Sequence, residues 1–358
     1  MNTSGPSFRI RATGSARPRK APRKVPDLAR LCILLVSLFV AGSLAACGSG
    51  GDRPAGSAGS GGIGREVTEI RYQGWASQVT VVELAEALGY LPGLKLTWVG
   101  NTISGPQDIQ SVATGAVDIG GAFNGAVVKL VAQGAPIKAV VGYYGSDDKN
   151  YLGFYTVAGS PIRGPRDLIG KKVAMNALGA HYEAILDEYL KRGGLTPAEI
   201  KQVVPTVLPP VPTEQALRAG QIEVAGLQGA IRDKAVARGG LTPLFTDYRL
   251  LGPFTAGTQV LRTDFLAKNP HTARVLVTGV ARAVQWTQTQ PRDVVVARLE
   301  AIITERARKG EDTSVVAQWK STGVSQPGGV VADADLALWI NWLTVNGQLG
   351  RPVTPKDA

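Results

Sequence analysis

Polar residues and glycines follow several apolar segments of the sequence, at points where a helix is expected to begin. The five segments are Trp75-Ala76-Ser77-Gln78, Ser104-Gly105, Asn124-Gly125, Gly179-Ala180-His181 and Gln228-Gly229. The first backbone N–H groups of a helix have no intrahelical partner, and the helix dipole adds positive potential there. Such groups bind polar or anionic ligands without any chemical step. We therefore predict a ligand-binding site formed by Trp75, Ser77, Gln78, Ser104, Gly105, Asn124, Gly125, Gly179, Ala180, His181 and Gln228.

Most of these residues also have a structural interpretation. Trp75 follows an expected strand, where its ring either covers a bound ligand or packs at the edge of the sheet. Ser77, Ser104 and Asn124 are residue types that cap helices, and one side chain can both cap a helix and contact a ligand. His181 is one of two histidines in the chain and is either a ligand contact or a buried structural histidine.

The composition argues against catalysis. The chain has two histidines and two cysteines, Cys32 and Cys47, and it contains neither a Gly-x-Ser-x-Gly nor a His-Glu-x-x-His motif. Hydrolases of these two types are therefore not indicated. Two cysteines also cannot supply a disulfide scaffold or four zinc thiolates. We predict that the protein is not an enzyme and that it uses no metal and no cofactor.

The candidate residues lie between segments that alternate between strand and helix patterns. Apolar strand patterns occur at 67–73, 94–99, 115–121, 137–143, 172–175, 203–208 and 222–226. From about residue 270 the pattern becomes amphipathic and helical. These patterns predict an α/β fold with two doubly wound, parallel sheets, helices on both faces of each sheet, and a helical C-terminal part.

The two strand–helix runs contain an internal echo. Residues 113–121 and 218–226 have side chains of similar type in the same order, with an acidic residue (Asp118 and Glu223) inside an apolar strand. An amide residue followed by glycine comes next in both runs, at 124–125 and 228–229. We interpret this as two lobes built on one plan, in which the two acidic residues form structural hydrogen bonds.

The first 64 residues have the composition of an export signal followed by a tether. Residues 31–46 form an uncharged apolar run, shorter than the roughly 20 residues that span a bilayer as a helix. Leu44-Ala45-Ala46-Cys47 resembles the bacterial lipobox, whose cysteine is lipidated and begins the mature protein. We predict a lipoprotein signal peptide at 1–46, lipidation of Cys47, and a glycine-rich tether over 47–64. The predicted location is the outer face of the membrane. An ordinary signal peptide or an uncleaved anchor is the alternative.

The positive charge is concentrated in this leader. The chain has a net charge of +11, of which +7 belongs to residues 1–46 and +4 to the rest. A folded part with so small an excess of basic residues does not indicate nucleic-acid binding.

Four stretches of the sequence together resemble a known family. They are 104–120, 134–138, 167–173 and 216–221. In order and spacing they are similar to solute-binding proteins of ABC importers, in the nitrate, sulfonate, taurine and thiamine-precursor group. The resemblance implies a bilobal periplasmic-binding-protein-like fold of type II. Lobe 1 would comprise residues 65–144 plus 255–358, and lobe 2 residues 150–250.

The resemblance also implies a function. The protein would be a monomer that captures a small organic solute between its lobes and delivers it to an ABC permease and its ATPase. A sulfonate- or nitrate-type anion is one candidate, although no arginine falls in the five site segments and the serines expected near residues 177–180 are missing. One alternative is a lipoprotein that senses a ligand and signals to a membrane partner. Another is a relative that binds or makes a thiamine-precursor pyrimidine, but synthesis would need a cysteine-rich iron site and no cysteine follows Cys47.

Overall fold

The computed structural model describes residues 66–358. The predicted signal peptide (1–46), the lipidation site Cys47 and the tether (47–64) all lie outside the described residues. Within the described range, no helix combines the length and the apolar character needed to cross a bilayer.

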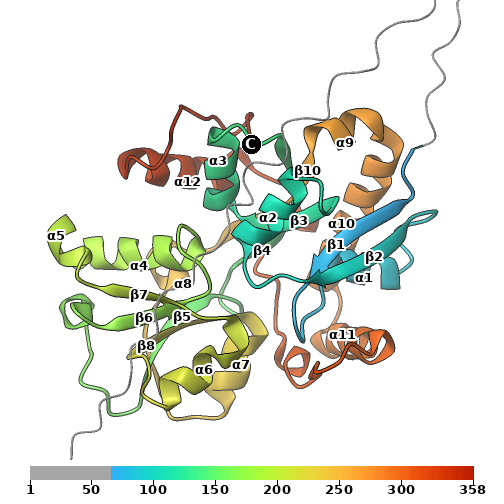
Figure 1. Cartoon of the computed structure of the whole chain (residues 1–358). Helices are drawn as coiled ribbons and strands as arrows, with labels where there is room; N and C mark the ends of the chain where they lie inside the picture. The colour runs from blue at the N-terminus through green and yellow to red at the C-terminus, as the bar shows by residue number, and fades with distance from the viewer. Residues whose placement is uncertain (1–65) are drawn as a thin grey trace, which may run out of the picture. The chain divides into compact units, whose positions relative to one another are not determined.

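The first of two five-stranded sheets has the strand order β2-β1-β3-β10-β4 (Figure 1). Its strands are β1 (Glu69–Gly74), β2 (Lys95–Asn101), β3 (Ile119–Phe123), β4 (Ile137–Ser146) and β10 (Phe254–Arg262). β1 pairs in parallel with β2 and β3, whereas β10 is antiparallel to both β3 and β4. All five residues of β3 are buried, as expected for a central strand covered on both faces.

The second sheet has the order β7-β6-β8-β5-β9. Its strands are β5 (Leu152–Val157), β6 (Lys172–Met175), β7 (Val204–Val207), β8 (Val224–Gln228) and β9 (Leu241–Thr246). β6 is parallel to β7 and β8, and β5 is antiparallel to β8 and β9. The second sheet thus repeats the plan of the first, with one antiparallel strand in the equivalent place.

Helices cover both faces of each sheet. The helices that accompany the first sheet and the C-terminal part are α1 (Val81–Ala87), α2 (Gly105–Ala113), α3 (Asn124–Ala132), α9 (Thr263–Lys268), α10 (Pro270–Thr289), α11 (Arg292–Arg306) and α12 (Asp333–Val345). Those that accompany the second sheet are α4 (His181–Arg192), α5 (Pro197–Ile200), α6 (Pro210–Arg218), α7 (Gly229–Ala237) and α8 (Asp247–Leu251). Three short 3₁₀ turns, η1 (Pro165–Leu168), η2 (Val316–Gln318) and η3 (Pro327–Gly329), complete the elements.

Three hydrophobic clusters hold these layers together. One packs α1, α10 and α11 on a face of the first sheet. A second packs α6 and α7 against the second sheet. The third contains side chains of α3 and α12 beside the first sheet and of α4 beside the second, so it is continuous across both. The predicted α/β fold, with helices around two sheets and a helical C-terminal part, is confirmed.

The prediction of parallel sheets is wrong, because each sheet contains one antiparallel strand. These strands, β5 and β10, are the first that the chain enters after leaving the other sheet, β10 through the short helix α8. A strand that follows a helical connection within one sheet runs in the same direction as the strand before it. A strand entered from a crossover begins at the opposite end of its sheet and therefore runs the other way.

The start of α6 lies in a proline-rich stretch. Prolines at 209, 210 and 212 are typical of a loop, but α6 begins at Pro210 and contains Thr213. Prolines fit the first turn of a helix, because the backbone N–H groups that they lack have no partner there.

The internal echo corresponds to equivalent structure in the two sheets. Asp118 accepts a hydrogen bond from the backbone N–H of Arg71 on β1 at 2.9 Å. Glu223 accepts one from the backbone N–H of Lys172 on β6, also at 2.9 Å. Both acidic residues thus tie the start of a central strand to its neighbour, which is the structural role predicted for them.

Candidate functional site

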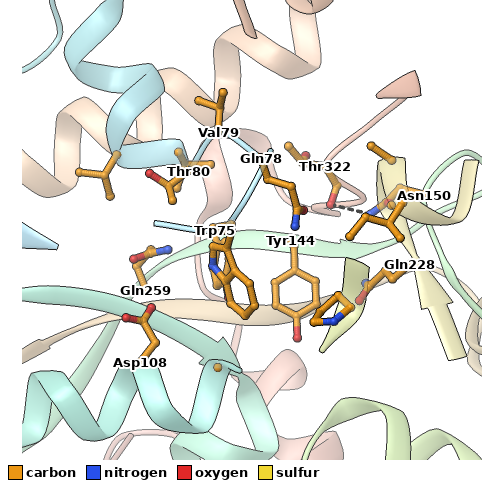
Figure 2. A pocket seen from close by; sticks show the side chains of 18 of the residues that line it. Trp75, Gln78, Val79, Thr80, Asp108, Tyr144, Asn150, Gln228, Gln259 and Thr322 are labelled. Carbon is orange, nitrogen blue, oxygen red and sulfur yellow. Dashed lines mark hydrogen bonds between the residues drawn. The ribbon is translucent and has the colours of Figure 1, made fainter. Parts of the chain in front are cut away.

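A cavity of about 270 Å³ is lined by residues of both sheets and of the segment between α11 and α12. Figure 2 shows side chains from these different parts of the chain pointing toward a common space. The carboxyl ends of β1, β3, β4 and β8 contribute, as do the first turns of several helices. This is where ligands bind in open α/β sheets.

The cavity brings together six of the residues predicted from the sequence. These are Trp75, Gln78, Gly105, Ala180, His181 and Gln228. The other five predicted residues do not line it: Ser77, Ser104, Asn124, Gly125 and Gly179. That the six contact a ligand stays a prediction, whereas the five have contacts within the protein.

Ser77 and Asn124 hold distant segments together. The Ser77 hydroxyl accepts a hydrogen bond from the backbone N–H of Asp312 at 3.0 Å. The side-chain amide of Asn124, which is fully buried, donates to the carbonyl of Thr255 at 3.0 Å and to that of Asp335 at 3.4 Å. Both side chains therefore join the first sheet to the C-terminal part.

The remaining three act within their own turns. Ser104 caps α2 by accepting a hydrogen bond from a backbone N–H of its first turn at 3.4 Å. Gly125 leaves room for a ring, since a Cβ there would lie 2.5 Å from the side chain of Phe123. Gly179 has φ of +67°, a conformation that favours glycine, and its N–H donates to the Glu183 carboxylate.

Aromatic side chains form one wall of the cavity. Ser77 adopts φ of +57°, and the N–H of Gln78 donates to the carbonyl of Trp75 at 3.2 Å, which closes a tight turn. This turn directs Trp75 and Gln78 into the cavity, where Tyr144 also points (Figure 2). The rings of Tyr143 and Tyr144 meet edge to face, with centroids 4.9 Å apart. Burial raises the pKa of both phenols, so they remain protonated hydroxyls.

Asp108 is buried in the wall contributed by the first sheet. Its Oδ2 accepts a hydrogen bond from the N–H of Gly121 at 2.7 Å, while its Oδ1 has no hydrogen-bond partner among the described residues. A Cβ at Gly120 would lie 2.8 Å from this carboxyl, and one at Gly121 would lie 2.7 Å from Gln259 and from the Tyr143 ring. Burial raises the pKa of Asp108 to about 7, and the Gly121 hydrogen bond opposes this shift. The two glycines therefore make room for Asp108, Gln259 and Tyr143 side by side.

His181 is 2% exposed and is surrounded by rings. It stacks on Phe123 with centroids 5.1 Å apart and meets Trp339 and Phe254 at their edges. Its Nε2 lies 3.2 Å from Oδ2 of Asp247, but the two atoms are not aligned for a hydrogen bond. His181 thus lines the cavity and also packs among the rings at the junction between the sheets. This packing supports a structural role for His181, while its position in the lining keeps it a candidate ligand contact.

The crossovers between the sheets meet beside the cavity. Asp247 is fully buried and accepts hydrogen bonds from the Ser146 hydroxyl at 2.9 Å and the Leu152 N–H at 3.0 Å. The side-chain amide of Asn150 donates to the carbonyl of Thr322 at 3.1 Å, a bond drawn in Figure 2. The end of β4, the start of β5, α8 and the segment before α12 are thereby fixed to one another.

The charges of the lining are unequal. Asp108 is its one carboxyl group, and neither lysine nor arginine occurs among the described residues that line the cavity. Arg249 and Arg262, near the second crossover between the sheets, lie outside the lining; Arg262 pairs with Asp264 at 2.9 Å. In residues 66–358 no group of three or more His, Cys, Asp or Glu residues is placed to hold a metal ion.

Sequence reasoning missed several polar and aromatic residues of the lining. They are Gln73, Asp108, Tyr143, Tyr144, Asn150, Gln259 and Thr322. Two signals were present in the sequence. Adjacent glycines inside a buried strand, as in β3, indicate the close approach of another group. Tyr143 and Tyr144 stand near the carboxyl end of a strand, where ligands bind.

Comparisons with solved structures agree with this architecture. The aliphatic sulphonate binding protein SsuA from Escherichia coli matches 82% of this chain and 92% of its own, with 21% identity and a TM-score of 0.62. The nitrate-binding protein NrtA from Synechocystis PCC 6803 matches over 81% and 84%, with 15% identity and a TM-score of 0.62. The desulfurization enzyme DSZB matches over 82% and 95%, with 16% identity and a TM-score of 0.56. At these identities the likeness establishes the fold.

Family membership follows from the sequence. No match was found among curated proteins. The model of the family described as NMT1/THI5 like matches residues 77–294, more than half of the chain and most of the two strand–helix runs. This match confirms the family resemblance predicted from the sequence, and the chain belongs to the NMT1/THI5-like family.

Proposed function

We propose that this protein is an exported solute-binding receptor of an ABC importer, which captures a small organic molecule between two lobes and presents the closed form to a permease. The lobes are residues 65–144 plus 255–358 and residues 150–250. The ligand contacts include Trp75, Gln78, Gly105, Ala180, His181 and Gln228.

The position of the cavity carries this proposal. The cavity is lined from both sheets, and short crossovers join the sheets beside it. A ligand that contacts both lobes stabilises the closed arrangement over the open one, so its presence can be read by a partner that binds only the closed form.

Binding rather than catalysis fits the groups in the lining. The lining contains one carboxyl and one histidine, and no cysteine follows Cys47 in the chain. The phenols that line it have raised pKa values because of burial, so they do not act as bases near neutral pH. The desulfurization enzyme DSZB has a similar fold. Chemical conversion of a bound ligand by this protein would therefore contradict the proposal that it only binds its ligand.

The receptor reaches its place through the N-terminus. Signal cleavage before Cys47 and lipidation of its thiol would attach the protein to the outer face of the membrane, with the glycine-rich stretch of residues 47–64 as the tether. In the proposed arrangement the anchored protein is a monomer.

Native mass spectrometry of the full-length protein, extracted from membranes, tests ligand capture. We expect a bound small molecule that leaves on unfolding, and an unchanged molecule after prolonged incubation. Chemical conversion of the released molecule would instead indicate an enzyme. The same spectra give the oligomeric state, and a dimer would contradict the monomer.

A Cys47→Ala variant tests the anchor. We expect the wild-type chain to incorporate labelled palmitate and to sediment with membranes, and the variant to do neither. A Cys32→Ala variant is the matched control and should behave as wild type, because Cys32 lies within the segment removed with the signal. Palmitate incorporation by Cys47→Ala would show that the lipobox was misidentified.

A further inference from the structure

The polar groups left without partners in the cavity are not evenly distributed. On the side of the first sheet, Oδ1 of Asp108, Oε1 of Gln259 and Oε1 of Gln73 are buried and have no hydrogen-bond partner among residues 66–358. All three are acceptors when Asp108 is ionised, at a pH above its raised pKa of about 7. On the side of the second sheet, the buried Nε2 of Gln228 is an unpartnered donor, and both ring nitrogens of His181 also lack a hydrogen-bond partner among the described residues. An amide can rotate to exchange its ends, but a carboxylate cannot, so Asp108 sets this polarity.

An unpartnered buried acceptor costs folding free energy unless something donates to it. Asp108 is 4% exposed, and its side chain lies in the cavity wall near Gln259 (Figure 2). A ligand with an N–H group would satisfy this oxygen in ionised Asp108, whereas a sulfonate or nitrate would bring a second acceptor against it. With neither lysine nor arginine in the described lining, the charge of such an anion would also lack a cationic side chain.

The helix N-termini at the cavity do not reverse this balance on the side of the first sheet. α3 has no side-chain cap, but its first residues, Asn124 and Gly125, lie outside the lining. The first turn of α1 is occupied by the capping box of Thr80 and Glu83. The first turn of α2 is capped by Ser104, contains Pro106, and carries Asp108 itself. By contrast α4 and α7 have no side-chain cap, so their free N–H groups provide donors on the side of the second sheet.

The internal echo provides a comparison for Asp108. Aligning Gly115 with Gly220 places Asp108, the fourth residue of α2, opposite Thr213, the fourth residue of α6. Thr213 is also buried, but its hydroxyl donates to the carbonyl of Pro209 at 2.8 Å and is satisfied within the helix. The same fold thus accommodates a neutral, satisfied side chain at this position, so packing alone does not explain the carboxyl in the first sheet.

We propose that the cavity selects an organic ligand with a nitrogen donor end, an amine, amidine or amino-substituted heterocycle, which donates to Asp108, and that it rejects simple sulfonates and nitrate. This deepens the proposed function and rests on it, because it takes the cavity as the ligand site. The aromatic faces of Trp75 and Tyr144 cover the body of the ligand, and such faces also favour a cationic end. The lining thus argues against the anionic solute considered from the sequence.

A matched set of small probes tests the ligand class on the wild-type, full-length protein. Benzamidine and benzoate have nearly the same planar shape, but the first carries donors and positive charge and the second acceptors and negative charge. 4-Aminopyrimidine and unsubstituted pyrimidine differ by the amino group alone. Methanesulfonate and nitrate represent the rejected anions. Binding is measured at pH 8, where Asp108 is ionised, by isothermal titration calorimetry and by thermal shift.

We expect benzamidine to bind at least tenfold more tightly than benzoate, and 4-aminopyrimidine more tightly than pyrimidine. Asp108→Asn should lower benzamidine affinity at least tenfold, since an amide nitrogen then takes the place of the free acceptor. The matched control is Asp187→Asn, which changes another carboxyl of raised pKa that lies outside the cavity lining; its affinities should equal those of wild type. The comparison between probes needs no variant, so it stands if Asp108→Asn fails to fold.

Two kinds of failure are distinguishable. Tighter binding of benzoate, methanesulfonate or nitrate would overturn the nitrogen-donor inference and leave the receptor function intact. If no probe binds, the molecule recovered by native mass spectrometry decides: one without an N–H donor overturns the inference, and one with such a donor supports it. No bound probe and no recovered molecule would overturn both the inference and the proposed function.

Discussion

Without ligand, the Asp108→Asn variant should become increasingly more stable than the wild type as the pH rises from 4 to 7. The carboxyl has a pKa near 3.8 in the unfolded chain, and burial raises it to about 7 in the folded protein. Between these two values the folded state holds a proton that the unfolded state has lost, so ionisation favours unfolding. Asparagine keeps an oxygen for the Gly121 N–H, bound at 2.7 Å in the wild type, and it does not ionise.

The magnitude follows from the distance between the two pKa values. Each pH unit between them is worth about 1.4 kcal/mol, so the wild type loses roughly 4 kcal/mol relative to Asp108→Asn between pH 4 and pH 7. Below pH 4 both states bind the proton and the two proteins should have similar stability. Above pH 7 both states have lost it and the difference should be constant.

Urea unfolding at 25 °C, at half-unit steps from pH 4 to pH 8, measures this difference. Asp187→Asn serves as a control for the position of the curve, because burial raises the pKa of Asp187 only to about 6 and its difference should level off one pH unit earlier. A difference between Asp108→Asn and wild type that does not change with pH would refute the reasoning. It would mean that Asp108 is ionised in the folded protein and stabilised by a partner.

Three further predictions concern the cavity. Benzamidine affinity should fall about tenfold per pH unit below pH 7, because Asp108 must lose its proton to bind a cation. Tyr143, the titratable neighbour that faces Asp108, stays protonated throughout this range. Calorimetry in two buffers of different ionisation enthalpy would detect the proton that Asp108 releases on binding. Gly120→Ala should weaken benzamidine binding about tenfold, since its Cβ would lie 2.8 Å from the Asp108 carboxyl; unchanged binding would contradict the placement of this side chain. Trp75→Ala should lower the affinity for benzamidine and leave the melting temperature within a few degrees of wild type. His181→Ala should lower the affinity and also cost about 2–4 kcal/mol of stability, because the His181 ring is packed among other rings. Equal melting temperatures of the two variants would contradict this distinction.

The sequence predicts the general plan of the fold because that plan depends on local patterns. The alternation of apolar strands with helices indicates two covered sheets. The echo between 113–121 and 218–226 corresponds to strands that occupy equivalent places. The direction of β5 and β10 was not predictable in this way. It depends on the chain having just left the other sheet, a long-range event that leaves no mark in the pattern of the strand itself.

The candidate site was predictable only in part, for a related reason. Helix starts with a small polar residue and a glycine, such as Ser104-Gly105, can be recognised in a sequence, but the contacts of their side chains depend on residues far away in the chain. Ser77 is engaged by Asp312, more than 200 positions later. Asp108 has the appearance of an ordinary acidic residue in the first turn of a helix, where it favours the dipole. Its burial becomes evident only when β3, with two glycines, is placed against α2.

The comparison between the two lobes gives a last, independent test of Asp108. If the fold needs only a side chain that fits this helix position, Asp108→Thr should fold, because Thr213 fills the same position of α6 and bonds to the carbonyl four residues earlier. The Gly121 N–H loses its acceptor, at a cost of about 1 kcal/mol, while the burial of an ionisable carboxyl is relieved at neutral pH. We therefore expect a melting temperature at pH 7 no lower than that of wild type, with the preference for benzamidine over benzoate abolished. A variant that is stable and still prefers benzamidine would show that selectivity resides elsewhere in the cavity. A variant that unfolds at pH 4, where the wild-type carboxyl is neutral, would show that Asp108 serves the fold.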